Sequence, residues 1–299
     1  MDAGKNDWLE ICVHVDGEAA EAVSELFNRY GRGGAVVEHL FSDGLGAHDN
    51  LDNLSVKTYI PAGDVQLKKK VEQGLWHLGQ LYPIPEPTFA VLAETDWAEA
   101  WKAHYGVLHI GQRTVIVPRW QTYHPQEGEL TIILDPRMAF GTGTHPTTQL
   151  CLAALEEAIQ PGMRVLDVGT GSGILSIAAA KQGAAAVHAV DVDQVAVASA
   201  RENVVENDVA GVVRVEAGSI ERAVGTYDLV LVNILARVIL LLLQDGLADA
   251  LKPGGTVIAS GIIDDQEPEV RASLQAHGIE VVGRHIQRDW VALVGRRSA

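Results

Sequence analysis

The chain has 299 residues, of which 47% are hydrophobic and 21% are charged, so it can form a core and is not a disordered polymer. Its length suggests about two domains. With 39 acidic and 23 basic side chains, the net charge is −16. This charge argues against a general binder of nucleic acids or anionic membranes and favours a basic macromolecule as partner.

The chain shows no sign of export or membrane insertion. It has no run of 18 apolar residues, and its first ten residues lack the pattern of a signal peptide. We therefore expect a soluble, cytoplasmic protein. Cys12 and Cys151 lie far apart, without the spacing of a zinc site. We expect two buried free thiols and no bound metal.

The first third of the sequence alternates between strand and helix patterns. Strands are predicted at 8–15, 33–41, 55–60 and 88–93, and helices at 17–30 and 63–82. This β-α-β-β-α-β order is that of a ferredoxin-like α+β sandwich. The acidic stretch 42–53, rich in Gly, Asp and Asn, predicts an exposed loop. We expect an N-terminal ferredoxin-like domain over residues 1–94.

A short amphipathic helix is predicted at 95–107, because Trp97, Trp101 and Tyr105 recur on one face. We interpret it as a linker to a second domain over residues 108–299. There, strand-like runs at 109–120 and 130–136 precede a regular alternation of strands and helices that starts near residue 145, including a helix at 235–251. That alternation is typical of an α/β fold with a doubly wound parallel sheet.

The clearest motif is RVLDVGTGSG at 164–173, an apolar strand followed by glycines at alternate positions. Gly169, Gly171 and Gly173 allow a tight turn and a close ligand, and the helix that begins at Ile174 points its positive end there. The spacing is not the GxGxxG of dinucleotide sites, and no Lys-Ser/Thr pair follows as in a phosphate loop. A pyrophosphate ligand is therefore disfavoured.

Two carboxylates flank the glycines. Asp167 would repel a pyrophosphate and favours a ligand with positive charge. Asp191 ends the next predicted strand, where an acidic side chain can accept both ribose hydroxyls. S-adenosylmethionine meets these demands, because it carries an ammonium, a sulfonium and a ribose diol but no phosphate. An NAD-dependent oxidoreductase conflicts with the glycine spacing and with Asp167, whereas glycine turns without any ligand are the simplest alternative.

A third polar position is Asn233, in the apolar strand predicted at 227–235. It lies at the edge of the sheet where ligands of this architecture bind. We expect its amide oxygen to accept a hydrogen bond from a substrate amine and to aim the nitrogen lone pair at a methyl group. The alternative is that Asn233 caps the following helix.

These residues resemble a known group of enzymes. VLDVGTGSG with Asp191, Asn233 and LKPGG is similar to class I S-adenosylmethionine-dependent methyltransferases over residues 145–299. DPRMAFGTGTHPTTQLCL (135–152) closely resembles the signature of the methyltransferases that modify large-subunit ribosomal protein L11, and residues 95–120 are similar to that family's linker. The resemblance implies a Rossmann-like protein N-methyltransferase for lysine or N-terminal amines of L11, whose N-terminal domain presents the substrate.

The resemblance also implies individual roles. It places cofactor contacts at Thr148, Gly169, Asp191 and Asn233. It further implies a loop that closes over the cofactor and the incoming amine, with the residues Phe140, Gly141, Thr142, Gly143, Thr144 and His145. An ordinary turn with a helix cap is the competing interpretation of this loop, and His145 is more often structural than catalytic in such a place.

Two further readings stay open. Asn233 is followed by Ile234 and Leu235 rather than by the Pro-Pro-aromatic motif of many nucleic-acid amino methyltransferases, which favours a protein amine without direct nucleic-acid binding. The protein substrate could still differ, since a related branch modifies an electron-transfer flavoprotein subunit. A non-catalytic module that binds S-adenosylmethionine is the other alternative, against which Asp167, Asp191 and Asn233 argue.

Overall fold

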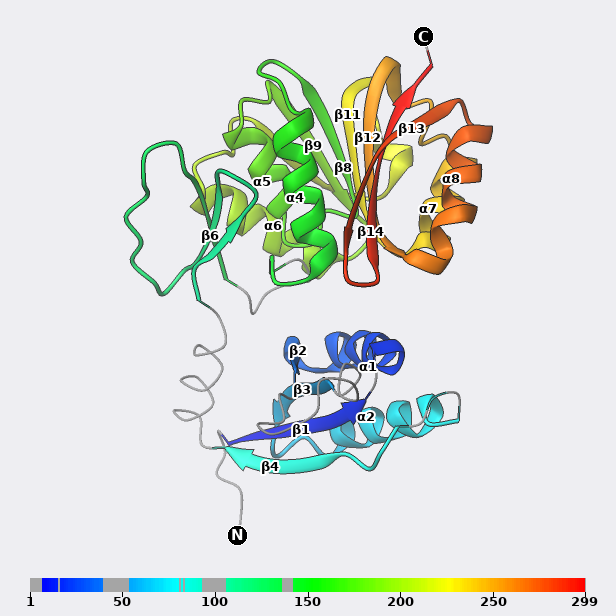
Figure 1. Cartoon of the computed structure of the whole chain (residues 1–299). Helices are drawn as coiled ribbons and strands as arrows, with labels where there is room; N and C mark the ends of the chain where they lie inside the picture. The colour runs from blue at the N-terminus through cyan, green and yellow to red at the C-terminus, as the bar shows by residue number, and fades with distance from the viewer. Residues whose placement is uncertain are drawn as a thin grey trace, which may run out of the picture. The chain divides into compact units, whose positions relative to one another are not determined.

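The structure is a computed structural model and describes residues 7–15, 17–39, 54–80, 82, 84–92, 106–135 and 142–298. The chain divides into two compact units, 1–105 and 106–299 (Figure 1). The linker helix predicted at 95–107 lies almost entirely outside the described residues, as does the predicted loop at 42–53.

The first unit has the predicted β-α-β-β-α-β order. Its elements are β1 (Trp8–Val15), α1 (Gly17–Tyr30), β2 (Arg32–His39), β3 (Leu54–Pro61), α2 (Val65–Leu78) and β4 (Thr88–Leu92). The sheet order is β2-β3-β1-β4, with all neighbours antiparallel. Alternate residues of β1, Ile11 and Val13, are buried with Val23 and Phe27 of α1, because successive strand residues point to opposite faces. The ferredoxin-like prediction is confirmed.

The second unit is built on a seven-stranded sheet. Its main elements are α4 (Pro146–Ala158), β8 (Arg164–Val168), α5 (Ile174–Lys181), β9 (Ala186–Asp191), α6 (Gln194–Glu206), β10 (Val213–Ala217), β11 (Tyr227–Asn233), α7 (Ala236–Gln244), β12 (Leu251–Ile263), α8 (Glu267–Ala276), β13 (Ile279–Gln287) and β14 (Trp290–Arg297). The order is β10-β9-β8-β11-β12-β14-β13, parallel from β10 to β12, with β14 antiparallel to both neighbours. The doubly wound fold is confirmed.

Helices cover both faces of this sheet, α4, α5 and α6 on one side and α7 and α8 on the other (Figure 1). The central strands are therefore buried on both faces, which explains their continuous apolar sequences. In β8, for example, Val165 packs in one layer and Leu166 in the other. Cys12 and Cys151 are buried free thiols, as predicted. None of the helices in the described residues is long and apolar enough to cross a membrane.

Two element predictions were wrong. The run at 109–120 is a hairpin of β5 (Leu108–Ile110) and β6 (Thr114–Pro118), because Gly111 adopts a positive φ of 62° and turns the chain. The helix predicted at 235–251 ends at Gln244, and β12 begins at Leu251. Gly246, with a φ of 98°, ends that helix in a Schellman motif, in which the Leu247 N–H donates to the Leu242 carbonyl.

A small sheet, β5-β6-β7, with β7 at Leu130–Leu134, is fastened to α4 and α6 by side chains. Glu156 of α4 accepts hydrogen bonds from the backbone N–H groups of Gln112, Arg113 and Thr114 and from the Thr114 hydroxyl. At the C-cap of α6, the Asn207 side chain accepts from the Ile133 N–H at 2.8 Å and donates to the Ile133 carbonyl at 2.7 Å. These contacts attach the small sheet to the helical layer.

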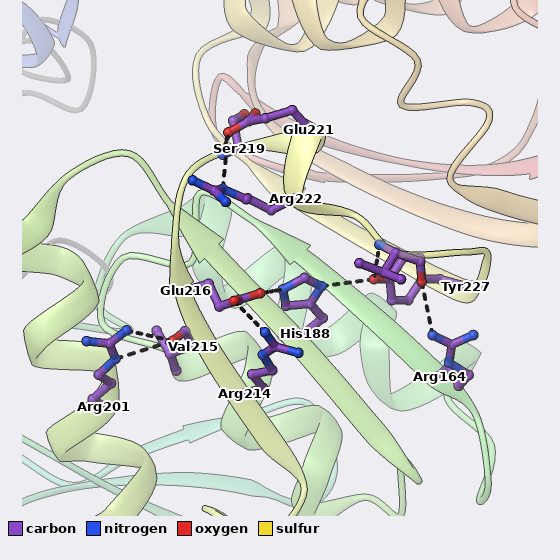
Figure 2. Close-up of polar contacts among 11 residues, drawn as sticks. Arg164, His188, Arg201, Arg214, Val215, Glu216, Ser219, Glu221, Arg222 and Tyr227 are labelled. Carbon is purple, nitrogen blue, oxygen red and sulfur yellow. Dashed lines mark hydrogen bonds and ion pairs between the residues drawn. The ribbon is translucent and has the colours of Figure 1, made fainter.

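A polar network joins β9, β10 and β11 (Figure 2). His188 Nε2 lies 2.6 Å from Glu216, and its Nδ1 lies 2.9 Å from the Tyr227 hydroxyl. Because the Glu216 carboxylate accepts from Nε2–H, Nδ1 of the neutral ring accepts the Tyr227 hydroxyl proton, and the Val224 N–H donates to Tyr227 Oη. Arg214 donates to the other oxygen of Glu216. The chain between β10 and β11 forms only a 3-10 turn, Ile220–Arg222. The side-chain network therefore stabilises the pairing of these strands with β9, the strand that ends at Asp191.

We predict that Glu156→Gln lowers the free energy of unfolding by about 2 kcal/mol. The amide NH₂ that replaces one carboxylate oxygen cannot accept the hydrogen bonds that the backbone N–H groups and the Thr114 hydroxyl donate to Glu156. Burial alone would raise the pKa of Glu156, but the hydrogen bonds from Thr114, Gln112 and Arg113 outweigh it and lower the pKa below 4.5. The stabilisation is therefore present above the ordinary glutamate pKa and is lost as the pH falls through the lowered value.

Urea unfolding at neutral pH and at successively lower pH measures this effect. Glu157→Gln, a neighbour on α4 whose side chain is 71% exposed, is the matched control and should change little. Equal stability of the two variants at neutral pH would contradict the role given to Glu156.

Candidate functional site

The predicted site residues gather at the carboxyl ends of three neighbouring parallel strands. Val168 of β8 pairs with Val190 of β9 and with Val232 of β11. Asp191 and Asn233 are the last residues of β9 and β11, one position beyond these partners. The sheet therefore brings together side chains that lie up to 66 positions apart in the sequence, and it does so at the edge where open α/β sheets bind ligands.

The glycine loop follows β8 and requires its glycines. Gly169, Gly171 and Gly173 have φ angles of 75°, 56° and 83°, a backbone region that side chains disfavour. A Cβ at Gly169 would also lie 2.6 Å from Ile234 Cγ2. The backbone thus turns within a few residues between the ends of β8 and β11 and leads directly into α5.

Asp167 lies under this loop and is 1% exposed. Its Oδ2 accepts hydrogen bonds from the hydroxyls of Thr170 at 2.7 Å and Ser176 at 2.6 Å. Its Oδ1 is buried and has no hydrogen-bond partner among the described residues. Burial raises the pKa of Asp167 to about 6, against these hydrogen bonds, and the charge of Asp191 raises it further. A buried carboxylate oxygen in this state favours a cation close by.

Asp191 fastens the loop to the next strand. Its Oδ2 accepts from the Gly171 N–H and its Oδ1 from the Asp193 N–H, both at 2.9 Å. Each carboxylate oxygen can accept a second hydrogen bond, so the side chain can still bind hydroxyl groups of a ligand. The two backbone contacts fix the orientation in which it would do so.

Asn233 meets Thr148, although the two residues lie 85 positions apart. Asn233 Nδ2 donates to Thr148 Oγ1 at 3.3 Å, and Thr148 is fully buried in the first turn of α4. The contact directs the amide nitrogen toward Thr148 and the amide oxygen away from it. The alternative that Asn233 caps the next helix is wrong, because Leu235 is the N-cap residue of α7 and none of the described side chains caps this helix.

The loop before α4 is described from Thr142 onward, so Phe140 and Gly141 lie outside the described residues. The hydroxyls of Thr142 and Thr144 are 2.9 Å apart. Gly143 has a φ of 88°, and a Cβ there would collide with Ile116 and would lie 3.4 Å from Ile174 Cδ1. Because Ile174 begins α5, this part of the loop packs beside the end of the glycine loop.

His145 is the N-cap of α4. Its Nδ1 accepts from the Thr147 N–H at 3.3 Å and lies 2.7 Å from the Thr147 hydroxyl, and its ring packs edge-on against Trp290. Burial lowers the pKa of His145 to about 4, so the ring is neutral at pH 7. The geometry gives His145 the structural role that competed with a catalytic one.

Several residues that support the site could not be identified as functional from the sequence patterns considered above. Asn203 of α6 donates to the Ser172 carbonyl at 2.9 Å and supports the glycine loop. The sequence does contain a signal for Asn203, because this polar residue lies on the helix face that also buries Ala196, Ala200 and Val204, and a buried polar side chain needs a hydrogen-bond partner. Gln149 and Gln287, which contact each other beside His145, gave no comparable signal because both are only half-buried.

Comparison with known proteins identifies the family. A family model described as ribosomal protein L11 methyltransferase (PrmA) matches residues 7–298. Relatives called ribosomal protein L11 methyltransferase are 47% identical in Chloroflexus aurantiacus, covering 97% of this chain and 98% of the relative, and 45% identical in Exiguobacterium sp., covering 97% and 99%. The crystal structure of the ribosomal protein L11 methylase from Lactobacillus delbrueckii subsp. bulgaricus is 34% identical, with a TM-score of 0.59, and covers 65% of this chain and 100% of its own.

The family model and the two relatives match both units, whereas the resemblance seen in the sequence covered about two thirds of the chain. The chain belongs to the ribosomal protein L11 methyltransferase family and is an S-adenosylmethionine-dependent protein methyltransferase.

Proposed function

We propose that the protein transfers methyl groups from S-adenosylmethionine to lysine side-chain amines, N-terminal amines or both on ribosomal protein L11. The observation that carries the proposal is the Asn233–Thr148 contact, because it orients an amide oxygen beside the glycine loop. The names of the relatives support L11 as the substrate.

The residues present fit S-adenosylmethionine. The buried Oδ1 of Asp167, which has no hydrogen-bond partner within the described part of the chain, suits the positive charge of its methionine part, and Asp191 suits its ribose hydroxyls. Gly169 leaves the backbone accessible, and Thr148 and Asn233 complete the proposed set. When bound, S-adenosylmethionine supplies a methyl group on a positively charged sulfur. The proposal includes no metal ion.

The work of the protein is to present an uncharged amine. A lysine with a pKa near 10.4 is almost wholly protonated at neutral pH, so the site has to accept the small neutral fraction or lower the amine pKa by desolvation. His145 is a poor candidate for a base, since it has a pKa of about 4 and caps a helix. We assign the main contribution to positioning: Asn233 Oδ1 accepts an amine hydrogen and thereby aims the lone pair.

Substrate recognition is proposed for the N-terminal domain, residues 1–94, with 95–107 as linker and 108–299 as the catalytic domain. The net charge of −16 supports a basic protein partner, since ribosomal proteins bind RNA through Lys and Arg. The proposal involves no direct contact with nucleic acid and no membrane. It places the reaction in the cytoplasm, where ribosomal proteins are made.

Mass spectrometry of purified L11, incubated with the protein and S-adenosylmethionine, tests the proposal. We expect mass gains in steps of about 14 Da, one CH₂ for each methyl group, and near-complete loss of these gains with Asn233→Ala. Binding of S-adenosylmethionine without any mass gain would reject L11 as the substrate. Full turnover by Asn233→Ala would reject the role of the amide.

Thr148→Val should lower kcat about tenfold at saturating S-adenosylmethionine, because the variant keeps the shape of the side chain but removes the acceptor that orients Asn233. Thr148→Ser retains the hydroxyl and should stay close to the wild-type kcat. Steady-state kinetics with both variants measure the difference, and a wild-type rate for Thr148→Val would show that Asn233 needs no orientation.

The affinity for S-adenosylmethionine should fall as the pH drops below about 6, because the cation prefers ionised Asp167. The pKa of Asp167 is raised in the protein without ligand. Protonation of Asp167 therefore weakens the binding of S-adenosylmethionine at pH values below this pKa and has no effect at pH values well above it. A carboxyl group with a pKa of about 6 is about one quarter ionised at pH 5.5, so Kd should be about fourfold higher than at pH 7.5.

Isothermal titration calorimetry between pH 5.5 and 8 measures this dependence. Asp167→Asn should bind more weakly at pH 7.5 and should lose the dependence, because it carries no titrating carboxyl group. An unchanged pH profile in this variant would assign the effect to another group.

A further inference from the structure

The loop from Thr142 to His145 is held by a side chain of the helix that follows it. Gln149 of α4 donates from Nε2 to the Gly143 carbonyl at 3.3 Å and to the Thr144 carbonyl at 3.1 Å. Both amide hydrogens are thus used on consecutive carbonyls of the loop. A single side chain therefore fixes the path by which the chain enters α4.

Gln149 is itself held from a distant part of the sequence. Its Oε1 accepts from Gln287 Nε2 at 2.9 Å, and Gln287 is the last residue of β13, 138 positions away. With this contact, every donor and the acceptor of the Gln149 amide have a partner. A rotation of the Gln149 side chain would break three hydrogen bonds at once.

The same hairpin reaches the loop at a second point. Trp290 begins β14, and its ring lies 4.9 Å from the ring of His145, at an interplanar angle of 70°. The two contacts differ in kind, one a hydrogen bond and the other an aromatic edge-to-face contact. The end of the β13–β14 hairpin therefore supports the loop through Gln149 and through His145.

The loop in turn touches both halves of the site. Gly143 packs against Ile174 at the start of α5. Thr148 lies three residues beyond His145, and its N–H donates to the His145 carbonyl at 3.1 Å. Because Thr148 accepts the hydrogen bond from Asn233, a shift of the loop moves the group that orients the amide.

We propose that Gln149 is a positioning residue for methyl transfer: with Gln287 it fastens the Thr142–His145 loop to the β13–β14 hairpin and so holds Thr148 against Asn233. This inference rests on the proposed function. It also predicts a direction of action, from Gln287 through Gln149 to the loop. Gln287 should therefore have no effect of its own once the Gln149 side chain is gone.

Steady-state kinetics on L11 and hydrogen exchange of the peptide 142–150, without L11, test the proposal together. Gln149→Ala should lower kcat about tenfold, leave the KM for L11 within about twofold, and speed up exchange in 142–150. Gln149→Glu, which has the same shape but places an oxygen against the two carbonyls, should behave in the same way. Gln275→Ala, an exposed glutamine on α8, is the matched control.

The direction of action is tested by a double-mutant cycle. Gln287→Ala should show a smaller loss of kcat than Gln149→Ala, and the double variant should match Gln149→Ala alone. Additive losses would overturn the relay from Gln287. Either a wild-type kcat or wild-type exchange in Gln149→Ala would overturn the positioning role.

Failure of the proposed function gives a different result. If the wild-type protein bound S-adenosylmethionine but did not methylate L11, the substrate assignment would fall. The exchange measurement needs no substrate and would still decide the inference: faster exchange in 142–150 for both Gln149 variants supports the fastening of the loop, and unchanged exchange rejects it.

Discussion

The buried carboxylate of Asp167 is the constraint on which the site depends. One of its oxygens is committed to the hydroxyls of Thr170 and Ser176, which draws the glycine loop and the start of α5 together around it. The other oxygen lies in the interior without a partner in the described residues. An ionised carboxylate in that position is costly unless a cation is near, so the fold itself favours a positively charged ligand at the loop.

The second half of the site comes from the N-terminus of α4 rather than from the glycine loop. Thr148 is placed there by the helix, and the helix start is set by the His145 cap and by the Gln149 contacts. Asn233 connects the halves, since it belongs to the sheet but is oriented by the helix. In the proposed mechanism these groups orient the substrate amine and do not take up its proton.

The sequence predicted the sheet and the polar edge well, because parallel strands end at one edge and alternate glycines have a local signal. It also predicted the short N-terminal elements, where hydrophobic periodicity is regular. It missed the end of α7, where Gly246 stops the helix earlier than the apolar pattern suggests, and it missed the turn at Gly111. The Gln149–Gln287 contact had no local signal at all, because its partners meet only after the whole sheet has formed. Side-chain contacts across long separations are set by tertiary packing, which periodicity does not encode.

The Asn207 contact has a consequence for association. β7 is an edge strand of the small sheet, so no strand of that sheet pairs with its outer backbone groups. The primary amide of Asn207 has its oxygen and one N–H on the same side and binds both the N–H and the carbonyl of Ile133. One side chain thus takes the place of a neighbouring strand at this point. The protein closes part of an open sheet edge with its own helix, and a foreign strand finds those two groups already paired.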